Sequence, residues 1–345
     1  MKNKIIIFII LFLSIISLLS SERLLNSVNI RRLINPYYMN CDKRRVYIID
    51  HSIKRVLGYS IYTLKKNFEI RYKKGQGPGD FPWAPAILTN KKNIMLFTTV
   101  KIAYYNKQGQ FLHEKRFHPR GILKPFGNNY IFFHYSFVKK AMFNVFELWN
   151  SNLKRIKTII KRRNRGKRYI MYVGMKKKGT IPIFKERILW DTGDNQFIIC
   201  DPADNYKIKI YDNRVKHINT LEIKYPNIKI MKKDKIKLVE KTRIKMGFNN
   251  RKWKELLKQN NIYCPEYFPP VQNIKVADGN LYIRTYKVLG NNRQYIIVNL
   301  KTGKSKKLLL PETDYWAVRD NIYLFLKYSE NDDLWGLNSV KINLK

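Results

Sequence analysis

The chain repeats a short strand-like pattern along most of its length. Six stretches rich in β-branched and aromatic residues have the length of a strand, and each is followed after a short turn by a second such stretch. In five of the six units a third stretch follows, and a shorter segment precedes most of them. The six leading stretches span 46–50, 94–99, 130–136, 197–201, 281–286 and 322–328. A repeated unit of about four strands therefore constrains the fold more than any other feature.

The spacing of these units predicts a ring of blades. Three of the five steps between leading stretches are 48, 36 and 41 residues, near the 40–50 residues of one blade of a β-propeller. The two longer steps contain 161–179, which is rich in basic residues, and 231–263, whose apolar spacing indicates an amphipathic helix. We therefore expect an all-β fold, a six-bladed β-propeller of four-stranded blades, with a helical insertion near 231–260.

The two ends of the repeat fit together. The sixth unit stops at Lys345, one strand short of a blade, and an unassigned strand-like segment lies at 27–34. If that segment supplies the missing outer strand, it closes the ring and covers the last open sheet edge. The alternative is that 22–35 form a disordered leader. With closure, 22–345 form a single propeller domain.

The first 21 residues have the order of a secretory signal. Lys2 and Lys4 precede an unbroken run of Ile, Phe, Leu and Ser over 5–19, and the small residues Ser20 and Ser21 follow. A spanning helix needs about 20 apolar residues, so a cleaved signal peptide is favoured over a retained N-terminal anchor. We expect an extracytoplasmic protein, in the periplasm or secreted.

One motif, Gly-Gln-Gly-Pro-Gly-Asp-Phe at 75–81, joins the first unit to the second. Glycine and proline suit a sharp return of the chain from the outer edge of one blade to the axis of the ring. Pro82 and Pro85 occupy the place where the helix of a dinucleotide-binding loop would start or run, which argues against that loop. No Lys-Ser or Lys-Thr follows the motif, which excludes a P-loop. With 46–81 around it, this motif resembles the exported bacterial six-bladed β-propellers with NHL-like repeats. The resemblance covers 46–345 by pattern, although units two to six lack the Gly-Pro-Gly return.

The chain carries 68 Lys and Arg against 25 Asp and Glu, a net charge of +43. Such a balance favours an anionic partner, and export excludes nucleic acid. Residues 154–178 hold twelve cations and no acid, while 224–258 hold thirteen cations and three acids, so the second stretch could make peripheral contact with an anionic membrane. The alternative is a solvated basic surface. The residues that we expect to bind an anionic surface, glycan or protein partner are Arg162, Arg163, Arg165, Lys167 and Arg168.

Candidates for catalysis are few. The closest carboxylates are Asp191, Asp194, Asp201 and Asp204, but one strand separates the two pairs by about 20 Å, so they cannot share one ion. Trp83, which follows the Gly-Pro return, either packs between blades or binds a sugar. We predict no catalytic residue, metal or cofactor, and interpret the chain as a non-catalytic binding propeller. The alternative is a metal-dependent propeller lyase or hydrolase that acts on an acidic glycan or a lactone.

Overall fold

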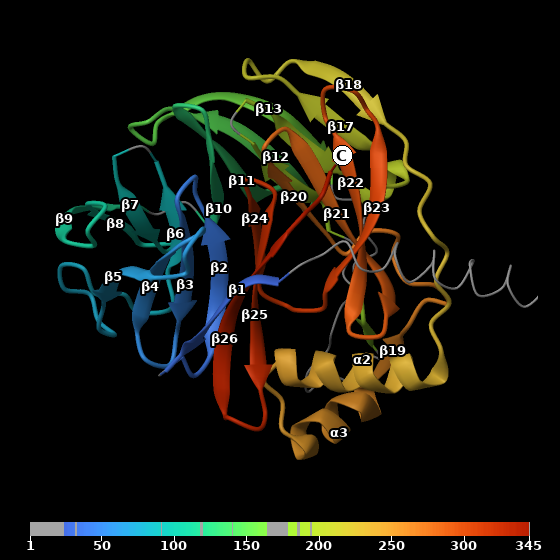
Figure 1. Cartoon of the computed structure of the whole chain (residues 1–345). Helices are drawn as coiled ribbons and strands as arrows, with labels where there is room; N and C mark the ends of the chain where they lie inside the picture. Colours follow the sequence, from blue (N-terminus) through green and yellow to red (C-terminus); the bar gives the residue numbers. More distant parts are fainter. Residues whose placement is uncertain are drawn as a thin grey trace, which may run out of the picture.

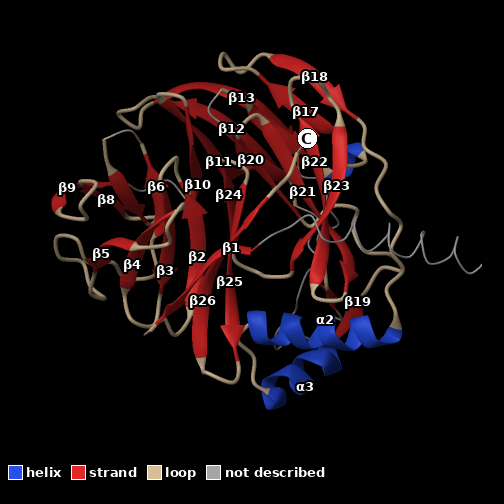
Figure 2. Cartoon of the chain, viewed as in Figure 1, coloured by secondary structure: helices blue, strands red, loops and turns tan. Residues whose placement is uncertain are grey.

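The computed structural model describes residues 24–31, 33–90, 92–117, 120–139, 141–163, 179–184, 187–193 and 195–344. Six antiparallel four-stranded sheets stand around a common centre (Figure 1; Figure 2). The predicted six-bladed β-propeller is therefore confirmed. The signal sequence expected at 1–21 lies outside the described residues. None of the described helices is long and apolar enough to span a membrane.

The blades follow the chain in order. Blade 1 contains β2 (Pro36–Cys41), β3 (Arg45–Asp50), β4 (Arg55–Ser60) and β5 (Lys66–Arg71). Blade 2 contains β6 (Ala86–Thr89), β7 (Ile94–Phe97), β8 (Lys101–Tyr105) and β9 (Phe111–Arg116). Blade 3 contains β10 (Gly121–Phe126), β11 (Asn129–Val138), β12 (Ala141–Trp149) and β13 (Arg155–Arg163).

Blade 4 contains β15 (Leu189–Thr192), β16 (Phe197–Cys200), β17 (Ile208–Tyr211) and β18 (His217–Leu221), with a 3-10 turn, η1 (Pro202–Asp204), between its middle strands. Blade 5 contains β20 (Asn273–Ala277), β21 (Asn280–Leu289), β22 (Asn292–Asn299) and β23 (Ser305–Pro311). Blade 6 contains β24 (Trp316–Arg319), β25 (Ile322–Ser329), β26 (Leu334–Lys341) and the N-terminal strand β1 (Leu24–Ile30).

Strand β1 closes the ring. It pairs antiparallel with β26, from Leu24 opposite Val340 to Ile30 opposite Trp335. The closing strand was predicted at 27–34, but it ends at Ile30 because the chain must then cross to the inner strand β2. The carboxylate of Asp50 holds this crossing, since its Oδ2 accepts hydrogen bonds from the backbone amides of Ile34 (2.6 Å) and Asn35 (3.0 Å).

Antiparallel blades give the ring two different faces. The turns that join the first to the second strand and the third to the fourth lie on one face, which we name the turn face; in blade 1 these are 42–44 and 61–65. The turns between the second and third strands and the connections between blades lie on the other, the connection face; in blade 1 these are 51–54 and 72–85. Residues far apart in the sequence are therefore neighbours on each face.

Apolar side chains fill each of the six interfaces between adjacent blades, and every interface has its own buried cluster. The interface between blades 1 and 2 contains Tyr47, Phe68 and Phe81, which are 1%, 6% and 1% exposed. The wedge between radial sheets needs bulky side chains, which explains the abundance of aromatic residues.

The 75–81 motif makes the return from β5 to β6. Gly79 has a φ of +74°, a conformation that favours glycine. The buried amine of Lys101 donates hydrogen bonds to the Gly77 carbonyl (2.6 Å) and to Glu114 Oε2 (2.8 Å), and that oxygen also accepts one from the Gly79 amide (3.0 Å). The motif therefore has a structural role.

The second insertion pairs with a strand that begins at the end of the first. Strand β14 (Gly179–Pro182) pairs in parallel with β19 (Asn260–Tyr263), although 77 residues lie between the end of β14 and the start of β19. The predicted single helix is two, α2 (Lys232–Lys245) and α3 (Asn250–Gln259). The break follows from Gly247, whose φ is +71°, and from Asn249, whose side chain caps α3. Ile181, Trp253 and Leu256 form a small separate core.

Candidate functional site

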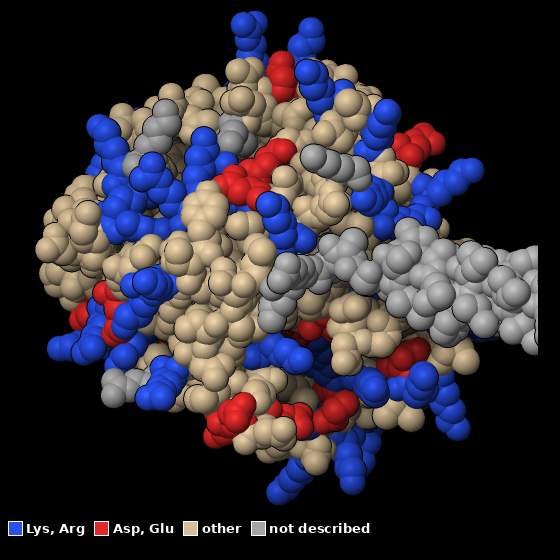
Figure 3. Space-filling model, in the orientation of Figure 1, with Lys and Arg blue, Asp and Glu red and all other residues tan. Residues whose placement is uncertain are grey.

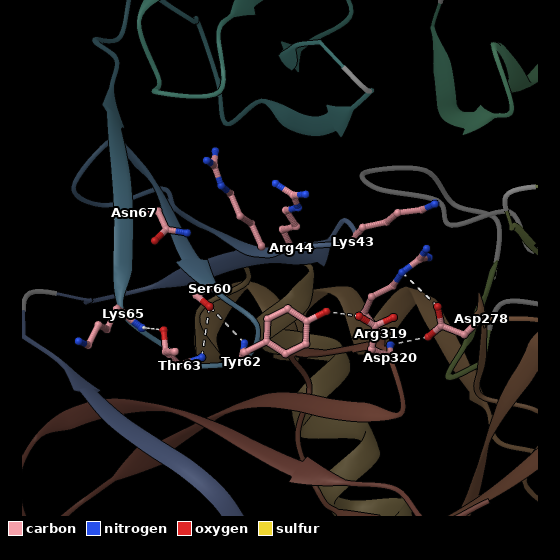
Figure 4. Close-up of a pocket in the computed structure, with 11 residues that line it drawn as sticks. Lys43, Arg44, Ser60, Tyr62, Thr63, Lys65, Asn67, Asp278, Arg319 and Asp320 are labelled. Atoms are coloured by element: carbon pink, nitrogen blue, oxygen red, sulfur yellow. Dashed lines mark hydrogen bonds and ion pairs between the residues drawn. The ribbon is translucent and has the colours of Figure 1, made fainter.

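A pocket of about 800 Å³ opens on the turn face, where the turns of blades 1, 5 and 6 meet (Figure 4). Blade 1 contributes most of the lining, and blades 5 and 6 contribute three residues between them. The pocket is lined by Lys43, Arg44, Arg45, Ser60, Tyr62, Thr63, Lys65, Asn67, Asp278, Arg319 and Asp320. It exists only because the ring is closed, since blades 1 and 6 come from opposite ends of the chain.

Asp42 shapes the turn that carries the first cations. Its Oδ1 accepts hydrogen bonds from the backbone amides of Arg44 and Arg45, both at 2.9 Å, and its Oδ2 accepts one from the Tyr47 hydroxyl at 2.5 Å. Burial acts to raise the pKa of Asp42, but these hydrogen bonds outweigh it and hold the pKa below its usual value. The carboxylate stays charged inside the turn, while Lys43 and Arg44 are exposed at its tip.

Tyr62 forms the centre of the pocket. The Ser60 hydroxyl accepts hydrogen bonds from the amides of Tyr62 and Thr63, both at 3.2 Å, which fixes the 61–65 turn. The Tyr62 hydroxyl donates to Asp320 Oδ2, and this bond raises the pKa of Tyr62. Its ring is held at the hydroxyl end yet remains 50% exposed, with Lys43 and Arg44 on one side of it (Figure 4).

Both acids of the pocket already have partners within the protein. Asp278 Oδ1 lies 3.1 Å from Arg319 Nε, and Asp278 Oδ2 accepts a hydrogen bond from the Asp320 amide at 2.5 Å. Asp320 in turn accepts the hydroxyl of Tyr62. These contacts link blades 5, 6 and 1 along the rim and leave neither carboxylate as a free negative charge.

The remaining charge in the pocket is positive. Five cations line it against two acids. The guanidinium of Arg45 is engaged, because it donates to the Lys107 carbonyl and lies 5.4 Å from the centre of the Phe68 ring. The side chains of Lys43, Arg44 and Lys65 are exposed and make no hydrogen bond or ion pair within the described part of the chain. This arrangement can accept an anion.

The inner strands present a different environment. They contact one another at the centre of the ring. There the Lys124 amine donates to Asp191 Oδ1 (2.7 Å) and to the Trp190 carbonyl (2.9 Å), while Asp191 Oδ2 accepts the Val276 amide (2.7 Å). Both carboxylate oxygens are therefore occupied. Among the described residues, no three His, Cys, Asp or Glu side chains lie close enough together to hold a metal.

A second lysine at the centre is also engaged. Lys275 donates to the Trp316 carbonyl and lies 4.6 Å from the centre of the Trp316 ring. Burial lowers the pKa of Lys275 to about 8. Cys41 donates to the Val318 carbonyl at 3.3 Å, and burial raises the pKa of its thiol to about 12. These groups satisfy the free edge of β24, so their role is structural.

Arg162, Arg163 and Trp83, the predicted binding residues within the described part of the chain, do not line this pocket. Arg162 Nη1 lies 2.6 Å from Asp201 Oδ2, so Arg162 joins blade 3 to blade 4, while Arg163 is exposed at the end of β13. Arg165, Lys167 and Arg168 lie outside the described residues. Trp83 is 46% exposed on the connection face. Lys and Arg are spread over the whole surface visible in Figure 3, not gathered in one patch.

Sequence reasoning missed the pocket, although one signal was present. Asp42, Lys43, Arg44 and Arg45 are consecutive, and an Asp followed by cations between two strands indicates a turn that exposes them. Nothing local indicated that this turn would lie beside 319–320. That proximity depends on closure of the ring.

One comparison with a solved structure supports the fold. The chain is similar in structure to a protein from Bacteroides fragilis that is proposed to be exported, with a TM-score of 0.54 and 14% sequence identity over 94% of this chain and 96% of that one. It also matches the WD40 domain of Pan2 from Neurospora crassa, with a TM-score of 0.43 and 8% identity over 94% and 96% of the two chains. No protein-family model matches the sequence, and no curated protein matches it.

Proposed function

We propose that this chain is an exported, non-catalytic β-propeller that binds an anionic ligand, an acidic sugar, in the pocket on the turn face. One observation carries the proposal. Three exposed cations without partners in the described chain, Lys43, Arg44 and Lys65, line the same pocket as the fixed and half-exposed ring of Tyr62.

Export is supported by the basic and apolar order of residues 1–21. The structural similarity to a Bacteroides fragilis protein that is proposed to be exported agrees with this location. The 75–81 motif supports a finer proposal, that the chain is a divergent propeller of the NHL-like kind. The position of this motif in the return from β5 to β6 supports the proposal.

The lining favours a sugar acid over a bare inorganic anion. A tyrosine ring offers a flat apolar surface beside a polar edge, as a pyranose ring requires. Ser60, Thr63 and Asn67 add hydroxyl and amide groups beside it. A volume of about 800 Å³ is in the range of sites for ligands of a few rings. In this arrangement the sugar ring rests on Tyr62 and its carboxylate or sulfate reaches Arg44 and Lys65.

We favour a binding role over a catalytic one, because the pocket on the turn face has cations without partners in the described chain, whereas the charged groups described at the centre of the ring are already engaged with one another. The only pair of opposite charges that we describe on the inner strands, Lys124 and Asp191, is closed on itself. A metal-dependent lyase or hydrolase remains the alternative, and it would need ligands other than Asp191.

Isothermal titration with trigalacturonate tests this function, with the neutral trisaccharide maltotriose as the comparison probe. We expect trigalacturonate to bind the wild type, and the double variant Arg44→Glu, Lys65→Glu to bind it at least a hundredfold more weakly, because two attractions become repulsions. Lys301→Glu is the matched control, since Lys301 is exposed on the turn face in blade 5, away from the pocket lining. Equal binding by the double variant and the wild type would refute the site.

Tyr62→Ala separates the sugar from the anion. It should weaken trigalacturonate about tenfold or more and leave the weak binding of inorganic sulfate unchanged, because sulfate needs only the cations. If both probes respond alike, the ring has no role of its own and the ligand is a simple anion.

A further inference from the structure

The middle hairpin of blade 3 is longer than those of its neighbours. Strands β11 and β12 contain ten and nine residues, whereas β16 and β17 of blade 4 contain four each and β7 and β8 of blade 2 contain four and five. The first half of β11 is buried, whereas most side chains in its second half are exposed. This end projects on the connection face.

The projecting end is apolar. Tyr135, Phe137 and Val138 are 49%, 73% and 40% exposed, and Phe137 is the most exposed large apolar side chain among the described residues. A single exposed apolar residue is ordinary, but three within four positions at one tip mark a surface that contacts something.

The charges around this tip are positive. Lys139 follows Val138 in the turn, and Arg163 lies opposite Phe143 at the end of β13; both are exposed and make no ion pair within the described residues. Lys161 lies 5.3 Å from the centre of the Phe143 ring. The nearest acids across the interface to blade 4 are already paired, Asp201 with Arg162 and Asp204 with Lys209, both at 2.6 Å.

Other exposed apolar side chains lie on the same face of the ring. Ile34 and Tyr37 begin blade 1, and Trp83 lies in the return before blade 2; they are 63%, 61% and 46% exposed. Leu289, at the end of the long β21, is 48% exposed. The 330–333 turn of blade 6, on this face but across the ring from blade 3, carries three acids, so the face is more basic at blade 3 than at blade 6.

We propose that the connection face docks on the surface of an anionic lipid bilayer, with Phe137 and Val138 entering the interface and Lys139 and Arg163 beside the headgroups. Aromatic side chains favour the membrane–water interface, and cations next to them add attraction to anionic lipid. The occupant is a bilayer because the exposed apolar side chains at this tip stand beside cations that make no ion pair among the described residues, a combination that suits acyl chains next to anionic headgroups. In this orientation the pocket on the turn face points away from the membrane.

Sedimentation with phosphatidylcholine vesicles containing 30% phosphatidylglycerol tests the docking. Phe137→Ser should lower the partition coefficient of the full chain about tenfold, by the contribution of one buried aromatic side chain. The matched control is Ile156→Ser, because Ile156 is 51% exposed in the same sheet but at the turn-face end. The double variant Lys139→Glu, Arg163→Glu should lose binding to these vesicles and keep its weak binding to pure phosphatidylcholine.

A second measurement, fluorescence quenching, tests whether the β11–β12 hairpin itself enters the membrane, independently of any contribution of residues 1–21 to binding. Brominated lipids should quench the added fluorescence of Phe137→Trp but not that of Ile156→Trp. Equal vesicle binding by Phe137→Ser and the wild type would overturn the proposal, as would no extra quenching of Phe137→Trp. Either result is also what is expected if this face binds a protein and not a membrane. Arg44→Glu, Lys65→Glu should bind vesicles normally, so the two proposals fail separately.

Discussion

Gly58 links the packing of the core to the pocket. It lies opposite Phe68 in the pairing of β4 with β5, and a Cβ added to Gly58 would stand 2.1 Å from Phe68 Cε1. Since Phe68 is 6% exposed and its ring lies against Tyr47, with centroids 5.8 Å apart, the ring has no free space to enter. The same ring contacts Arg45 in the pocket lining.

Gly58→Ala should therefore destabilise the protein. In the interior of a strand, alanine is normally more stabilising than glycine by about 0.5–1 kcal/mol. Displacing a packed aromatic ring costs about 1–3 kcal/mol, so the expected net change in the free energy of unfolding is a loss of about 1–2 kcal/mol. Urea denaturation measures this difference.

A double-mutant cycle tests the reasoning more sharply than the single change. Phe68→Leu alone should cost about 1–2 kcal/mol through lost packing, but Gly58→Ala added to it should cost almost nothing, because the smaller side chain leaves room for the new methyl group. If the two losses simply add, the close approach of the ring to Gly58 is not the cause, and this explanation is wrong.

Three further changes have defined outcomes. Ile30→Ala should lower the free energy of unfolding by about 2–4 kcal/mol, because Ile30 is only 4% exposed in the strand that closes the ring. Asn29→Ala, on the exposed side of that strand, should change it by under about 0.5 kcal/mol. Urea denaturation measures both changes. Lys101→Met should lower the free energy of unfolding by about 2 kcal/mol at pH 7. Burial acts to raise the pKa of Glu114, but the hydrogen bonds from Lys101 and Gly79 outweigh it and lower that pKa. The loss caused by Lys101→Met should therefore shrink as the pH falls through the lowered pKa of Glu114. Burial lowers the pKa of Lys275 to about 8, so between pH 8 and about 10 the unfolded chain binds a proton that the folded chain does not. The free energy of unfolding of the wild type, relative to that of Lys275→Met, should therefore rise by about 1–3 kcal/mol over this pH range. A difference that does not change with pH would contradict this prediction.

The repeat made the architecture predictable. Each leading stretch, such as 46–50 or 322–328, contains a strand in the structure because a central strand of a blade is buried on both sides and so reads as a continuous apolar run. Closure of the ring was predictable for a related reason, since the last blade lacked one strand and the N-terminus had one to spare. The exact end of β1 was not, because it depends on the capping of 34–35 by Asp50.

Details that depend on contacts between distant segments could not be predicted from the sequence. The pairing of β14 with β19 joins segments from two different gaps in the repeat. The pocket joins the turns at 42–45, 60–67, 278 and 319–320. Charge density pointed to 154–178, but Arg162 there is engaged with Asp201, and 164–178 lie outside the described residues.

The position of a bound sugar acid tests the central claim most directly. Crystals of the protein soaked with trigalacturonate should show one ring against Tyr62 and its carboxylate within about 3 Å of the Arg44 guanidinium or the Lys65 amine. A ligand bound at the centre of the ring, or on the connection face, with this pocket empty would contradict the account.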